Sequence, residues 1–80
     1  MHPGESQTID TIARKITDYL KVNPRATDTV DGVANWWLGQ GGLRASEDQV
    51  QKALDLLVAQ QSVICRRSPD GHLLYGRRSA

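Results

Sequence analysis

The chain has 80 residues, a formal net charge of +1 and a hydrophobic fraction of 39%, so we expect one small domain with a modest core. Its single cysteine excludes an internal disulfide and fits a cytoplasmic location, and the near-neutral charge gives no global attraction to nucleic acid. The polar N-terminus lacks a signal-peptide pattern, and no apolar run reaches the roughly 18 residues of a membrane span.

The first predicted element is an amphipathic helix that begins at Thr8. Its apolar side chains recur with helical period and form one stripe, which consists of Ile9, Ile12, Ala13, Ile16, Tyr19 and Leu20. The helix is expected to end at Asn23, because the residue before a proline is pushed out of the α region. Residues 1–7 offer nothing to bury and are predicted to be a disordered N-terminal segment, with residues 8–78 forming a single domain.

A second helix is predicted to begin near Asp28, with Thr27 or Asp28 as its N-cap. Its buried stripe consists of Val30, Val33, Ala34, Trp37 and Leu38. Gly32 is unfavourable inside a helix and predicts a close approach by another helix. Trp37 lies on the stripe and is expected in the core. Trp36 lies at the edge, and it either anchors a protein interface or covers the first helix; we favour the second alternative.

A third helix is predicted after the glycine-rich stretch 39–42. Ser46 is its expected N-cap, and Gln49 lies at the capping-box position. The apolar stripe of this helix consists of Val50, Ala53, Leu54, Leu57 and Val58. Residues 43–45, just before the helix, could form one small strand that pairs with a later hairpin.

Residues 62–78, with the sequence SVICRRSPDGHLLYGRR, predict a β-hairpin. The turn Ser68, Pro69, Asp70, Gly71 suits a type I turn followed by a glycine with positive φ. The expected cross-strand pairs are Ser68 with His72, Arg67 with Leu73, Arg66 with Leu74, and Cys65 with Tyr75. Opposed side chains share a face of the sheet. One face would therefore carry Val63, Cys65, Leu73 and Tyr75, with Arg67 and Arg77 at its ends, and the other Ile64, Arg66 and Leu74. Cys65 is expected to be a buried small apolar residue rather than a nucleophile.

The positive charge of the chain is concentrated in this hairpin. Residues 62–80 carry four arginines against one aspartate, whereas residues 1–61 are net acidic. An arginine cluster can bind phosphate or an acidic protein surface, or it can keep a sheet edge from pairing with another chain. The candidate binding residues are Arg66, Arg67, His72, Arg77 and Arg78.

Three helices followed by the pattern VICRRSPDGHLLY resemble the winged helix-turn-helix family, and the resemblance covers nearly the whole chain. It implies an α+β fold in which three helices precede a C-terminal β-hairpin, the wing. It also implies that the third helix enters the major groove of DNA while the wing contacts the backbone. The stretch DTVDGVANWWL resembles one that recurs in small bacterial proteins.

The exposed positions expected on the third helix are Glu47, Asp48, Gln51, Lys52 and Asp55. Gln51 and Lys52 are the possible contacts, while the acids would be repelled by phosphate. The sequence has no phosphate-cradling glycine loop, no paired carboxylates with a pocket and no metal-ligand spacing, so we expect neither an enzyme nor a cofactor nor a small-molecule substrate.

We therefore expect a recognition module, either a monomer or a weak homodimer, that binds a partner protein through the basic hairpin and the side of Trp36. A DNA-binding transcriptional regulator remains the alternative.

Overall fold

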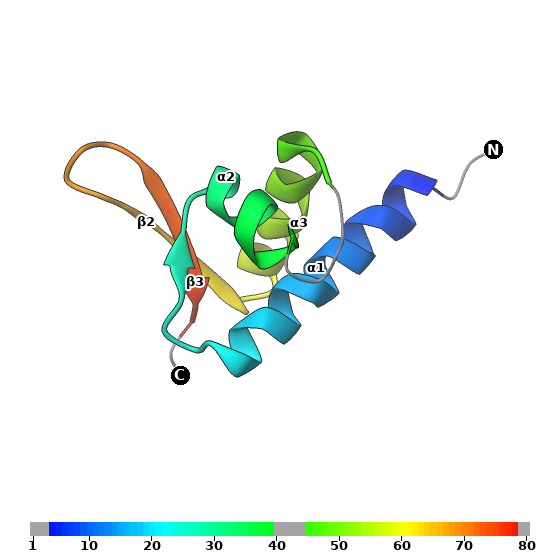
Figure 1. Ribbon diagram of the computed structural model, residues 1–80, viewed down its shortest axis with the longest axis horizontal. Helices are drawn as coiled ribbons and strands as arrows, with labels where there is room; N and C mark the ends of the chain where they lie inside the picture. The colour runs from blue at the N-terminus through cyan, green and yellow to red at the C-terminus, as the bar shows by residue number, and fades with distance from the viewer. Residues whose placement is uncertain (1–3, 40–44, 79–80) are drawn as a thin grey trace.

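The computed structural model describes residues 4–39 and 45–78 (Figure 1). These residues form helices and a small three-stranded antiparallel sheet, which confirms the α+β class. The elements in chain order are α1 (Gly4–Val22), β1 (Thr27–Asp28), α2 (Val30–Gly32), the π-helical turn η1 (Val33–Trp37), α3 (Glu47–Ala59), β2 (Val63–Arg67) and β3 (Leu73–Arg77).

Helix α1 ends at Val22, as predicted from the proline that follows Asn23. It begins at Gly4 rather than at the predicted Thr8, while residues 1–3 lie outside the described residues. The physical reason is that each residue added to an existing helix gains one hydrogen bond, so the helix extends beyond its buried stripe.

The second helical segment begins at Val30, two residues after the predicted start near Asp28, because Thr27 and Asp28 belong to strand β1. Thr29 is the N-cap, and its hydroxyl accepts a hydrogen bond of 3.1 Å from the Gly32 amide. Gly32 does not receive another helix: a Cβ atom there would overlap the carboxylate of Asp28, which accepts a hydrogen bond of 2.8 Å from the Thr29 amide. The absence of a Cβ atom at Gly32 therefore leaves room for the side chain of Asp28.

The π-helical turn η1 contains both tryptophans. The Leu38 amide donates to the Val33 carbonyl at 3.1 Å, which closes the wider turn. Trp37 is buried, as predicted, and stacks on Tyr19 of α1 with ring centroids 4.8 Å apart. Trp36 is 66% exposed, so the favoured prediction that it covers the first helix is wrong.

Helix α3 has the predicted capping box between Ser46 and Gln49. At its other end Gln61 adopts φ of 64°, and the Ser62 amide donates to the Leu57 carbonyl at 2.9 Å. This left-handed C-terminal motif turns the chain directly into strand β2.

The sheet has the strand order β1-β3-β2, and β2 pairs with β3 in the predicted hairpin register. The third strand is β1, which pairs Thr27 with Gly76 and Asp28 with Tyr75. The prediction that residues 43–45 supply this strand is not supported, because Ala45 is described and lies outside any strand, and residues 43–44 lie outside the described residues.

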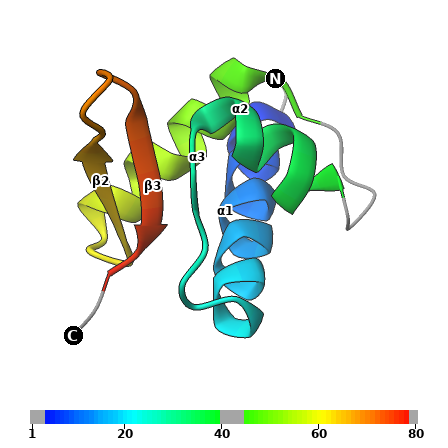
Figure 2. The ribbon, with the colours of Figure 1, turned by 60° about the vertical axis from the view of Figure 1, so that its left-hand side comes forward.

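Helix α3 lies behind one face of the hairpin (Figure 2). Val63 and Tyr75 on this inner face join the core cluster with α1 and α3, whereas Ile64 and Leu74 point from the outer face and are only half-buried. Cys65 shares the inner face but is exposed, so the prediction of a buried cysteine is wrong. Val63, on the same strand and face, is buried, whereas Cys65 lies two residues further towards the tip of the hairpin and outside the core cluster.

Among the residues that the structure describes, no helix is both long and apolar enough to cross a membrane.

Candidate functional site

The five candidate residues of the hairpin do not form one cluster, because they are distributed between its tip and its base. Arg67 and His72 lie at the tip, which projects away from the helices (Figure 1). The Nε2 atom of His72 lies 3.8 Å from Asp70, and the Ser68 hydroxyl donates to the same carboxylate. The hydrogen bond from Ser68 is the main cause that lowers the pKa of Asp70. The tip is therefore occupied by contacts that stabilise its own turn.

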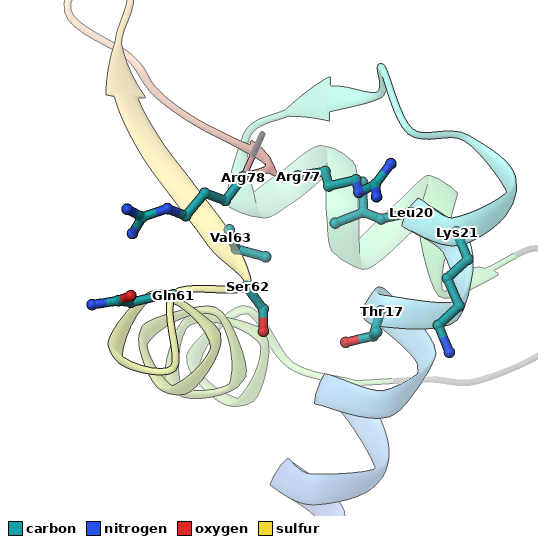
Figure 3. A pocket seen from close by; sticks show the side chains of 8 residues that line it. All are labelled: Thr17, Leu20, Lys21, Gln61, Ser62, Val63, Arg77 and Arg78. Carbon is teal, nitrogen blue, oxygen red and sulfur yellow. The ribbon is translucent and has the colours of Figure 1, made fainter. Parts of the chain in front are cut away.

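Arg77 and Arg78 lie at the base of the hairpin, beside the C-terminal half of α1 (Figure 3). A cavity of about 280 Å³, which we call the basal cavity, separates the hairpin from α1. Its lining consists of Thr17, Leu20, Lys21, Gln61, Ser62, Val63, Arg77 and Arg78. In Figure 3 Arg77 extends towards α1 and Arg78 extends the opposite way. Three cations therefore surround this cavity, and none of its lining residues is acidic.

Arg66 points from the outer face of the sheet into a second cavity, of about 290 Å³, which we call the outer-face cavity. It lies between the hairpin and residues 24–27, the segment that leads from α1 into β1. Arg25 and Arg77 also line it, and again no acidic residue does. Arg77 therefore connects the two cavities.

Together these side chains form what we call the basic surface: Lys21, Arg25, Arg66, Arg77 and Arg78. Within the described part of the chain, ion pairs join Lys52 with Asp48 and His72 with Asp70, and none involves a member of the basic surface. The sequence prediction missed Lys21 and Arg25. The only signal for them was a cation on each side of the chain reversal at Pro24, and sequence alone does not indicate that this reversal packs against the hairpin.

The two candidate contacts on α3 are engaged within the protein. Gln51 donates from Nε2 to Asp55 at 2.9 Å and to the Tyr75 hydroxyl at 3.0 Å, which ties α3 to the hairpin. Lys52 lies 3.4 Å from Asp48, one helical turn away. These interactions leave α3 with a surface dominated by its carboxylates.

The N-terminal end of α3 is acidic in its spatial setting as well as in sequence. Asp31, in the second helical segment, raises the pKa of Glu47 through a side-chain hydrogen bond and through charge repulsion. Asp48 follows in the same exposed first turn. A negative potential therefore surrounds the helix end that would approach phosphate groups in a DNA complex.

Two apolar features lie apart from the basic surface. Trp36 is exposed, and a cavity of about 310 Å³ lies at the end of α1, where it is lined by Tyr19, Val22, Trp37 and Leu38 together with polar neighbours. Trp36 does not line that cavity.

No group of three or more histidine, cysteine, aspartate or glutamate side chains within residues 4–39 and 45–78 is placed to hold a metal ion. Comparison of the chain with family models, with curated proteins and with solved structures finds no match.

Proposed function

We propose that this chain is a winged-helix domain that acts as a non-catalytic recognition module, and that it binds an acidic partner protein through the basic surface. The winged-helix assignment is supported by the order of helices and strands, by the sheet order β1-β3-β2 and by the arginine-bearing hairpin in the position of the wing. The free, exposed Cys65 suits a reducing, cytoplasmic location.

The observation that carries the proposed function is the gathering of five cations, contributed by segments far apart in the sequence, around two adjoining cavities whose linings contain no carboxylate. Side chains of like charge that are held together without counter-charges favour an anionic partner.

An acidic protein fits the arrangement better than DNA does. The outer-face cavity lies on the side of the sheet away from α3, so a duplex held against Arg25 and Arg66 would not reach the exposed face of α3. A duplex held by α3 would instead meet Glu47 and Asp48. Repulsion of these carboxylates by phosphate opposes the docking mode of DNA-binding winged helices.

DNA binding remains the second candidate, and the observation in its favour is the arginine-rich hairpin itself. In this alternative the protein is a transcriptional regulator, and Arg67 and His72 at the exposed tip would contact the DNA backbone.

Fluorescence anisotropy with two labelled probes tests the proposal. One probe is a synthetic peptide in which Glu, Asp and Leu alternate, and the other is a random-sequence DNA duplex. We expect the peptide to bind more tightly than the duplex at equal ionic strength, with an affinity that falls as salt rises. The double substitution Arg66→Glu with Arg77→Glu should weaken peptide binding by about tenfold or more.

The matched control is Arg14→Glu with Lys15→Glu, which makes the same change in net charge at exposed positions of α1. It should change peptide binding little. Equal losses in the two double variants would contradict a localised site. Tighter binding of the duplex, with a steep fall of log affinity against log salt, would favour the DNA-binding alternative.

A further inference from the structure

The floor of the outer-face cavity is an apolar strip that no helix covers. Ile64, Leu74 and Gly76 lie on the same face of the hairpin because they alternate with the inner-face residues. Ile64 and Leu74 are half-buried and do not belong to the core cluster, which packs against the inner face. Ile64 and Leu74 are therefore an unpartnered part of the sheet.

Gly76 allows residues 24–27, which line one side of this cavity, to approach the hairpin closely. A Cβ atom at Gly76 would lie 3.0 Å from the Ala26 carbonyl oxygen and 3.0 Å from the Thr27 hydroxyl. The segment that leads into β1 thus passes close beside Gly76, the cross-strand partner of Thr27, and it lines the cavity together with Ile64 and Leu74. This close approach brings Arg25, at the start of the segment, to the same opening as the hairpin arginines.

The rim of the cavity is formed by Arg25, Arg66 and Arg77. A guanidinium group recognises a carboxylate by paired, charge-assisted hydrogen bonds. The cavity volume of about 290 Å³ exceeds the roughly 150 Å³ of an apolar cavity that holds a benzene ring. It therefore has room for one bulky side chain between three carboxylate-binding groups.

We propose that the outer-face cavity binds an acidic segment of the partner protein, with one bulky aliphatic or aromatic side chain seated on Ile64 and Leu74 and carboxylates on both sides of it paired with Arg25, Arg66 and Arg77. This inference rests on the proposed function and specifies the chemistry that the site selects. It also makes Arg25, outside the hairpin, part of the recognition site.

An acidic peptide suits this cavity better than a single-stranded nucleic acid. Nucleic-acid bases are held largely by stacking on aromatic side chains, and no aromatic side chain lines the cavity. The aliphatic side chains and the arginines of the cavity instead match a segment that alternates apolar and acidic residues. The apolar residues of the segment would contact the aliphatic side chains, and its carboxylates would pair with the arginines.

The experiment is a selection of peptides from a random library on the immobilised full chain, followed by affinity measurements on the enriched peptides. We expect enrichment of sequences in which an aliphatic or aromatic residue is flanked by Asp or Glu. Arg25→Glu should weaken their binding by about tenfold or more. Lys21→Glu, the matched control, makes the same charge change in the basal cavity alone and should have a smaller effect.

A second measurement changes the peptide and uses the wild-type protein. Replacement of the apolar residue of an enriched peptide by serine should weaken binding by about tenfold. Circular dichroism of the two charge variants checks that each remains folded.

The outcomes distinguish a failure of the outer-face cavity as the recognition site from a failure of the proposed function. Acidic peptides that share no apolar residue, and that respond equally to Arg25→Glu and Lys21→Glu, would overturn the outer-face cavity as the recognition site while the proposed function stands. A selection that enriches no acidic peptides would overturn both.

Discussion

Tyr75 is one of the residues that join the hairpin to the helices. Its ring is 3% exposed within the core, and its hydroxyl accepts the hydrogen bond from Gln51 of α3. Arg66 follows Cys65, the cross-strand partner of Tyr75, and Arg77 lies two residues after Tyr75 on β3. A loss of the link would loosen the hairpin against the helices.

Tyr75→Phe should lower the free energy of unfolding by about 1 kcal/mol at neutral pH, since it removes this hydrogen bond while Gln51 keeps its bond to Asp55. Burial is the main cause that raises the pKa of Tyr75 above its ordinary value. The neutral hydroxyl is therefore favoured by folding, and this contribution is complete below about pH 10 and is lost as pH rises through the raised pKa.

Urea unfolding at neutral pH and above about pH 10 checks both parts of this prediction. The stability difference between the wild type and Tyr75→Phe should narrow at the higher pH, because the phenylalanine variant has no hydroxyl to ionise. A difference that stays constant or widens there would contradict the assigned role of burial.

At the scale of elements, the features that the sequence predicts correctly are those with a local cause. The capping box of Ser46 and Gln49, the end of α1 before Pro24 and the hairpin register around Gly71, with its φ of 90°, each depend on neighbouring residues. Residue chemistry within a few positions is enough to specify them.

The features that the sequence does not predict depend on contacts between distant segments. Strand β1 has two residues and pairs closely with Gly76, nearly fifty positions away, where a Cβ atom would crowd Ala26 and Thr27. The same approach places Arg25 beside Arg66, so the basic surface was only partly predictable. The burial of Cys65 was mispredicted for a related reason, because alternation identifies its face but not whether another element covers it.

The end of helix α3 offers a test at this scale. Gln61 holds a left-handed conformation that side chains with a Cβ atom adopt at a cost of about 1 kcal/mol, whereas glycine adopts it freely. Gln61→Gly should therefore raise the free energy of unfolding by about 0.5–1 kcal/mol. The adjacent Gln60 has φ of −83°, so Gln60→Gly is the matched control and should be destabilising. Thermal or urea unfolding measures the free energy of unfolding of both variants. A loss of stability in both would contradict the prediction.

At the scale of the whole molecule, charge is separated between two regions. The basic surface occupies the base and outer face of the sheet, and carboxylates of the second helical segment and of α3 form the other region. Because the net charge is only +1, this separation rather than total charge determines how a charged partner is oriented. An acidic partner would be directed to the sheet and away from α3.

The most direct test of the proposed function is to map the amide resonances of the ¹⁵N-labelled chain during a titration with the acidic peptide. The proposal predicts shift changes in residues 21–27, 62–66 and 74–78, which surround the two cavities, and little change in residues 47–55 of α3. Changes centred on α3, with the basic surface unaffected, would contradict it.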